Sequence, residues 1–187
     1  MKFDHFAAIA SIYARVTYSK TDMMREIAAL PVAGRLLDVG GGTGRVASAV
    51  REFVDEVVIA DVSRGMLKEA PRPALEPVCG ESESLPFADN SFERVIMVDA
   101  LHHVAHHTLS AHEMFRVLKP GGLLVIEEPD IRTFGVKLIA LAEKLLLMRS
   151  HFLAPKAIAG LFPDEEVRIR AEDGTAWVIV KKIQVTR

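Results

Sequence analysis

Short apolar runs alternate with amphipathic stretches along most of this chain. The apolar runs are rich in Val, Ile and Leu, and their lengths suit strands that are buried on both faces. Several of the stretches between them repeat apolar positions at the spacing of a helix. This alternation is typical of a parallel sheet with helices on both faces. The pattern predicts an α/β fold, with strands over 35–39, 56–61, 75–78, 94–100 and 122–128 and helices over 44–53, 63–70 and 108–118.

The two ends of the chain have different patterns. Residues 3–30 are amphipathic with a break near 17–21, and we expect residues 1–30 to form a helical lid. Near the other end, two β-rich runs within 166–183 are joined by Asp173-Gly174, which is a strong hairpin signal. The sheet should therefore finish with an antiparallel pair.

Residues 131–162 are largely apolar, mostly at helical spacing, and the sequence leaves two interpretations open. They form either a pair of helices that covers the sheet, or an apolar cover near the acceptor site that forms its pocket or meets lipid.

Composition narrows the class of protein. The chain has 187 residues and a net charge of −2, which fits one domain and gives no electrostatic case for a nucleic acid partner. Its one cysteine can form neither an internal disulfide nor a cysteine zinc site. We find no signal-peptide pattern and no uncharged stretch of membrane-spanning length, so we expect a cytoplasmic protein.

The segment LLDVGGGTGRV, residues 36–46, places glycines where a ligand would meet the backbone. A P-loop is excluded, because its lysine and hydroxyl would have to follow Gly44, where Arg45 and Val46 stand. The dinucleotide pattern fails because it needs a glycine at Arg45. The spacing is instead D-x-G-x-G-x-G, and its carboxylate, Asp38, favours a cationic ligand over a pyrophosphate.

Asp61 ends the second predicted strand, 17 residues after Gly44. A carboxylate at that strand tip can accept both hydroxyls of a ribose. The alternative is that Asp61 only caps the next helix, although Ser63 is available as that cap.

Four segments in this order resemble the class I S-adenosylmethionine-dependent methyltransferases. They are LLDVGGGTG, VIADVSRGMLKEA, GESESLPFADNSFERVIMVDALHHV and RVLKPGGLLVIEEP, within residues 36–129. The sequence is most similar to the small-molecule branch that includes the ubiquinone and menaquinone biosynthesis enzymes. The resemblance implies one methyltransferase domain over 1–187 and S-adenosylmethionine as cofactor. It also implies a Rossmann-like, seven-stranded, mostly parallel sheet with an antiparallel last strand.

The resemblance also implies which residues bind the cofactor. The glycine loop would hold its methionine and ribose part, Asp61 the ribose hydroxyls, and Val62 the adenine. Glu81 stands where the family more often has Asp, and would accept from the adenine amino group. The expected cofactor-binding residues are Asp38, Gly40, Gly41, Gly42, Gly44, Asp61, Val62, Glu81 and Ser82.

Three polar residues follow the fourth predicted strand, where ligands bind in parallel sheets. We expect Asp99, His102 and His103 to lie near the reacting sulfonium, with one histidine taking a proton from the methyl acceptor. The alternative is that the histidines are only polar loop residues.

The segment HHVAHH, residues 102–107, also contains i, i+4 histidine pairs that would suit a metal on a helix. We expect no metal there, because the helix should begin only near Thr108 and no third ligand has a recognisable spacing.

The expected function is methyl transfer from S-adenosylmethionine to a small molecule, apolar quinone precursors included. A non-catalytic S-adenosylmethionine-binding module, regulatory or part of a larger complex, is the main alternative. A nicotinamide-dependent oxidoreductase is disfavoured by Arg45. Peripheral lipid contact and a homodimer are both left open.

Overall fold

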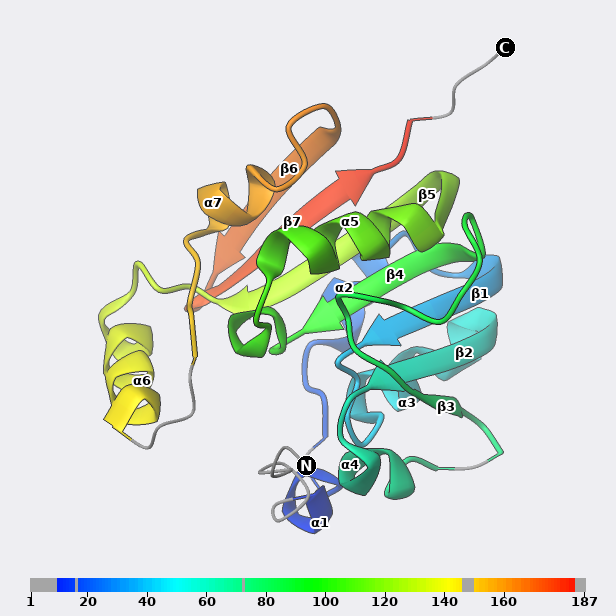
Figure 1. The fold of residues 1–187 in the computed structure, drawn as a ribbon, viewed down its shortest axis with the longest axis horizontal. Coiled ribbons are helices and arrows are strands. Elements are labelled where there is room, and N and C mark those ends of the chain that lie inside the picture. The colour runs from blue at the N-terminus through cyan, green and yellow to red at the C-terminus, as the bar shows by residue number, and fades with distance from the viewer. Residues whose placement is uncertain (1–9, 16, 72, 146–149, 184–187) are drawn as a thin grey trace.

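A seven-stranded sheet forms the centre of the computed structural model, which describes residues 10–15, 17–71, 73–145 and 150–183 (Figure 1). The strand order is β3-β2-β1-β4-β5-β7-β6, and β7 runs antiparallel to both of its neighbours. The other pairings are parallel, so the predicted sheet is confirmed. The strands are β1 (Val32–Val39), β2 (Val54–Asp61), β3 (Glu76–Cys79), β4 (Phe92–Val98), β5 (Leu118–Pro129), β6 (Glu166–Glu172) and β7 (Thr175–Lys181).

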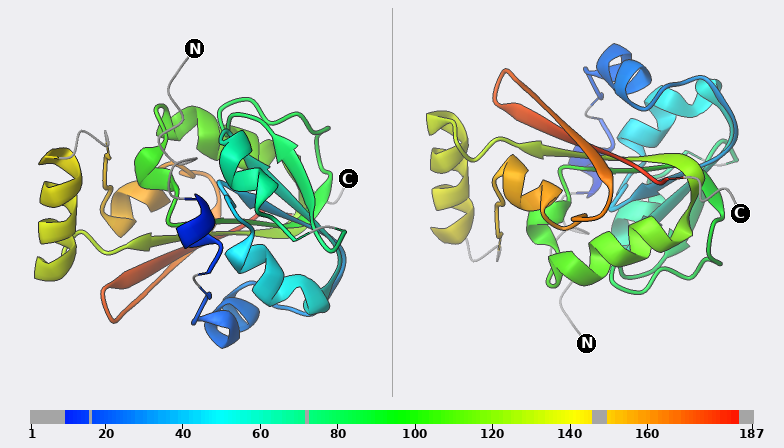
Figure 2. Two further views of the ribbon diagram at one scale, coloured as in Figure 1. Left: turned by 90° about the horizontal axis from the view of Figure 1, so that it is seen from below. Right: turned by 90° about the horizontal axis from the view of Figure 1, so that it is seen from above.

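Helices cover both faces of the sheet (Figure 2). On one face, α5 and α7 bury Met114 and Ile158 in a single apolar cluster with the strands. On the other face, α2 and α3 bury Met24 and Val50. The helices are α1 (Ala10–Tyr13), α2 (Thr21–Ile27), α3 (Arg45–Val50), α4 (Arg64–Lys68), α5 (His107–Val117), α6 (Phe134–Leu145) and α7 (Pro155–Ala159), with 3₁₀ turns η2 (Arg51–Phe53) and η3 (Leu101–His103).

The N-terminal segment is broken where the sequence predicts, because α1 ends at Tyr13 and α2 begins at Thr21. In Figure 1, α1 lies beside α4, below the carboxyl ends of the strands. Residues 1–9 of the expected lid lie outside the described residues.

One strand boundary differs from the prediction. Residues 119–121 separate the predicted helix from the predicted strand, yet they belong to β5, which begins at Leu118. The register with β4 shifts here, since Phe92 pairs with Leu118 while Arg94 pairs with Leu123. The extra residues are accommodated as a bulge, which is where proline and glycine are tolerated in a strand.

Residues 131–162 cover the sheet only in part. α7 packs on the β6–β7 hairpin, while α6 stands beyond the end of the sheet (Figure 1). The side chains of Phe134, Leu138 and Leu141 on α6 are 77%, 53% and 54% exposed. Residues 146–149 lie outside the part of the chain that the structure describes.

Gly44 and Gly121 form a matched pair for testing how tightly the glycine loop is packed. Both have positive φ, +78° and +80°. A Cβ at Gly44 would lie 2.7 Å from Leu75 Cδ1 and 2.8 Å from Ile59 Cδ1, whereas a Cβ at Gly121 would meet nothing within 4 Å.

We expect Gly121→Ala to lower the free energy of unfolding by about 1–2 kcal/mol, because alanine is strained at positive φ. Gly44→Ala should lower it by about 1–3 kcal/mol more, because its methyl group also overpacks the core. Urea unfolding of both variants measures the difference. Equal losses would show that the packing around Gly44 is looser than described.

Candidate active site

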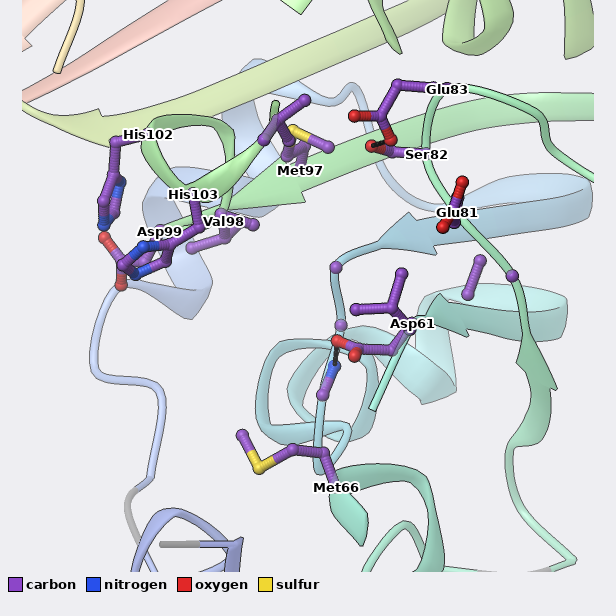
Figure 3. Close-up of a pocket in the computed structure, with 18 of the residues that line it drawn as sticks. Asp61, Met66, Glu81, Ser82, Glu83, Met97, Val98, Asp99, His102 and His103 are labelled. Atoms are coloured by element: carbon purple, nitrogen blue, oxygen red, sulfur yellow. Dashed lines mark hydrogen bonds between the residues drawn. The ribbon is translucent and has the colours of Figure 1, made fainter. Parts of the chain in front are cut away.

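A cavity of about 620 Å³ opens at the carboxyl ends of the central strands (Figure 3). It lies where the strand order reverses, with β2 on one side of β1 and β4 on the other. Ligands bind at this point in open α/β sheets, and roughly 300–1,000 Å³ is the usual size of a small-molecule pocket. Its walls come from the glycine loop after β1, the end of β2, residues 80–83 after β3, and residues 97–100 and 102–106 at and after the end of β4.

The glycine loop lines one wall through Gly40, Gly41 and Gly42. At Gly40, a Cβ would lie 2.6 Å from Ala100 Cβ, so the segments after β1 and β4 approach more closely than a side chain permits. The Gly42 N–H donates to Asp61 Oδ2 at 2.9 Å, and this hydrogen bond fixes the loop to the tip of β2.

Asp61 and Ser63 resolve the question of which residue caps α4. The Ser63 hydroxyl accepts from the Met66 N–H at 3.1 Å, so Ser63 is the cap, as the sequence predicts. Asp61 lines the cavity and accepts from the Ser63 N–H through Oδ1 and from the Gly42 N–H through Oδ2. The cavity therefore has a carboxylate at the strand tip that is held by two backbone donors.

Val62, Glu81 and Ser82 line the same end of the cavity. Val62 is 59% exposed, which leaves an apolar surface beside the carboxylates. The Ser82 hydroxyl lies 2.8 Å from the Ser110 hydroxyl of α5, and this contact ties the segment after β3 to the helix.

Asp38 and Gly44, both expected to bind cofactor, are not among the residues that line this cavity. Asp38 is buried beneath the loop, where a Cβ at Gly41 would lie 2.8 Å from its Oδ2. Burial raises the pKa of Asp38 to about 7, against the opposing charge of Arg45 and a hydrogen bond from Ala47. Its Oδ2 has no hydrogen-bond partner among the described residues. Asp38 therefore supports the loop from below.

Asp99 lies at the opposite end of the cavity and is paired with Arg45. Arg45 Nη2 donates to Asp99 Oδ2 at 2.5 Å, and the guanidinium lies 5.9 Å from the centre of the Tyr18 ring. Asp99 has a φ of 52°, which is uncommon for a residue other than glycine and occurs most often where a site requires it. From the sequence, Arg45 served only to exclude the P-loop and dinucleotide patterns.

His102 and His103 both line the cavity, at the end away from Asp61 (Figure 3). His102 is buried, and its ring stacks on Phe152 with centroids 4.3 Å apart. His103 is half-buried, with Nδ1 3.3 Å from the Ser150 hydroxyl. Phe152 belongs to residues 131–162, one interpretation of which was an apolar cover near the substrate, although the sequence did not single out this residue.

Two consecutive glutamates of β5 are the principal residues that sequence reasoning missed. Glu128 Oε2 lies 2.5 Å from His102 Nδ1. Glu127 accepts from the Tyr18 hydroxyl at 2.5 Å and the Trp177 indole N–H at 2.9 Å. Both are buried, and a pair of acidic residues closing an apolar strand was the available signal, since buried carboxylates are rare unless they have partners.

The remaining histidines of HHVAHH have separate surroundings. His106 lines the cavity, and its N–H donates to Glu83 Oε1 at 3.3 Å. His107 begins α5, one residue before the expected start, and burial lowers the pKa of its ring. Within the described ranges, no group of three or more His, Cys, Asp or Glu side chains is arranged to hold a metal ion.

Comparison with known protein families finds a match that covers most of the residues lining the cavity. Residues 37–126 match the family described as Methyltransferase domain. Residues 37–126 are therefore similar to a methyltransferase domain, in agreement with the resemblance that the sequence motifs show. Among the described residues, no helix has the length and apolar character needed to cross a membrane.

Two curated relatives show which kind of methyltransferase this part of the chain resembles. A demethylmenaquinone methyltransferase of Renibacterium salmoninarum is 42% identical over 103 residues, which cover 54% of this chain and 44% of that protein. The ubiquinone/menaquinone biosynthesis C-methyltransferase UbiE of Pseudomonas putida is 36% identical over 114 residues, or 55% of this chain and 44% of that protein. The matched part is less than half the length of either relative.

Solved structures show how widely the fold is shared. A SAM-dependent methyltransferase from Aquifex aeolicus superposes with a TM-score of 0.76 and 18% identity, covering 97% of this chain and all of that one. The [4+2]-cyclase SpnF superposes with a TM-score of 0.72 and 18% identity, over 91% of this chain and 85% of that one. At this identity the likeness concerns the fold alone.

The buried carboxyl of Asp38 should make stability depend on pH. An acid whose pKa is higher in the folded than in the unfolded chain binds its proton more tightly when folded, so folding is favoured at low pH. This advantage is lost as pH rises from the ordinary pKa of 3.8 to about 7.

In urea unfolding of the ligand-free protein, the stability of the wild type relative to Asp38→Asn should fall by up to about 1.4 kcal/mol per pH unit across that range. It should level off above pH 7, near the raised pKa. A difference that stays constant from pH 4 to 8 would contradict the raised pKa.

Proposed function

We propose that this protein transfers the methyl group of S-adenosylmethionine to a small acceptor, with apolar acceptors such as quinone precursors as the favoured class. The observation that carries the proposal is that one cavity has a strand-tip carboxylate, Asp61, at one end and the histidines His102 and His103 at the other. The carboxylate can accept hydrogen bonds from the hydroxyls of a nucleoside, and a histidine can take the proton that a methyl acceptor must lose.

The residues present fit the cofactor. Gly40, Gly41 and Gly42 line the cavity without side chains, so a ligand can approach the main chain there. Asp61 would accept the ribose hydroxyls, Val62 and Ser82 would contact the adenine, and Glu81 would accept from its amino group. When bound, S-adenosylmethionine supplies an electrophilic methyl group on a sulfonium. The chain itself contributes the positions of the two reactants and a base for the proton.

The acceptor end of the cavity is partly apolar. Phe152 and Pro129 line it together with the histidines. A flat or apolar molecule would bury its surface there while presenting an acidic hydrogen to a ring nitrogen. The names of the two curated relatives, both methyltransferases of quinone biosynthesis, support the same class of acceptor.

A non-catalytic module remains the alternative function. The cyclase among the structural neighbours shows that this fold also carries other reactions, so the fold alone does not show which function this chain has. The paired, buried His102 favours catalysis, because a module that only binds cofactor has no need of a base at the far end of the cavity.

The remaining expectations stay predictions. They are a cytoplasmic location, a lid formed by residues 1–30, peripheral lipid contact and a homodimer. We expect contact with lipid or with a second copy to use the exposed side chains of α6, Phe134, Leu138 and Leu141.

Cofactor choice is tested by thermal shift with S-adenosylhomocysteine and with NAD. A ligand at one hundred times its dissociation constant stabilises a protein by about 2.7 kcal/mol. We expect S-adenosylhomocysteine to raise the melting temperature and NAD to leave it unchanged. A shift with NAD alone would refute the assignment.

Asp61→Ala should weaken S-adenosylhomocysteine binding at least tenfold, because a charge-assisted hydrogen bond contributes about 1.5–3 kcal/mol. Calorimetry measures the affinity, and circular dichroism checks that the fold is retained. Ser63→Ala is the matched control, since it removes only the cap of α4 and should leave affinity within about threefold. Equal affinity for Asp61→Ala and wild type would reduce Asp61 to a purely structural residue.

A further inference from the structure

Glu128 stands at the end of β5, directly behind the turn that carries both cavity histidines. Its Oε1 accepts from the Ala100 N–H at 3.0 Å and from the Leu101 N–H at 2.7 Å. Its Oε2 lies 2.5 Å from His102 Nδ1. The carboxyl group is buried, and all three partners belong to the single segment 100–102.

Several further contacts fix the ring of His102 in one orientation. Phe152 stacks on the imidazole with an interplanar angle of 11°, and the His103 ring lies at 4.0 Å. The backbone is fixed as well, because the His151 N–H donates to the His102 carbonyl at 2.6 Å. The ring lines the cavity from a place where it has little freedom to turn.

We propose that Glu128 is a positioning residue that selects the tautomer of His102 and so prepares His102 to act as the base for the methyl acceptor. This inference rests on the proposed function for its reaction, while its statement about the tautomer stands independently.

The chemistry follows from what a carboxylate can do. An ionised carboxylate only accepts hydrogen bonds, so His102 must donate through Nδ1–H, and the basic lone pair of the neutral ring is on Nε2. As the acceptor atom bonds to the methyl carbon, the methyl–sulfur bond breaks with its electron pair on sulfur. The proton that the acceptor loses goes to Nε2. The resulting imidazolium is stabilised by the charge of Glu128, an arrangement that also serves Ser-His-Asp triads.

Two other polar side chains of the cavity have different surroundings. The Nδ1 of His103 lies 3.3 Å from a hydroxyl, the side chain of Ser150, which does not select a tautomer because it can donate or accept. Asp99 is engaged with Arg45.

The direct test is ¹⁵N NMR of the histidine rings in full-length protein saturated with S-adenosylhomocysteine. In the wild type, we expect His102 to be neutral with Nδ1 protonated and Nε2 unprotonated. Glu128→Gln can still accept from the backbone through its carbonyl oxygen, but it presents an NH₂ donor to Nδ1. His102 should then switch to the opposite tautomer, with the proton on Nε2.

Asp130→Asn is the matched control, because Asp130 is a buried carboxylate two residues further along that is paired with Arg132. It should leave the tautomer of His102 unchanged. With an acceptor in hand, Glu128→Gln should lower kcat at least about a hundredfold, while the KM for S-adenosylmethionine changes less than about threefold.

A wild-type His102 protonated on Nε2 would overturn the proposal, whether or not the variant folds. So would a Glu128→Gln variant that keeps the wild-type tautomer or near-normal kcat. Failure of the proposed function has a different signature, namely absence of methyl transfer in the wild type while the tautomers behave as expected.

Discussion

The structure of the site depends on the burial of two adjacent carboxylates, Glu127 and Glu128, at the end of β5. Consecutive residues of a strand face opposite sides of a sheet, so each carboxylate serves a different layer. Glu127 binds Tyr18 and Lys20, which precede α2, while Glu128 binds η3 on the other side. A buried carboxylate is tolerated only when donors surround it, and the segments on the two sides of the sheet supply those donors.

These contacts connect parts of the chain that are far apart in sequence. Tyr18 donates to Glu127 and lies beside Arg45, which in turn pairs with Asp99. The N-terminal segment, the helix after the glycine loop and the turn after β4 are therefore linked around one end of the cavity. At the other end of the cavity, the hydrogen bond from the Gly42 N–H to Asp61 links the glycine loop to the end of β2.

The strands, the order of elements and the positions of Asp61 and the histidines were predictable, because they depend on local pattern and on where each strand ends. The bulge in β5 was not, since Pro120 and Gly121 indicate a break and only pairing with β4 shows that the strand continues. The roles of Glu128 and Phe152 could not be predicted from the sequence either. Each lies more than 20 residues from His102, and no local signal relates them. Asp38 was placed on the cavity because a carboxylate beside a ligand loop suggests contact, whereas the side chain points beneath that loop.

Catalysis is the central claim, and transfer of label tests it most directly. The protein is incubated with S-adenosylmethionine labelled in its methyl group and a metabolite extract, and small molecules are separated from the cofactor. We expect label to appear in an acceptor that partitions into organic solvent, together with equimolar S-adenosylhomocysteine. Tight binding of S-adenosylhomocysteine without any labelled acceptor, across extracts that contain quinone precursors, would contradict the account and favour a module that binds the cofactor without using it.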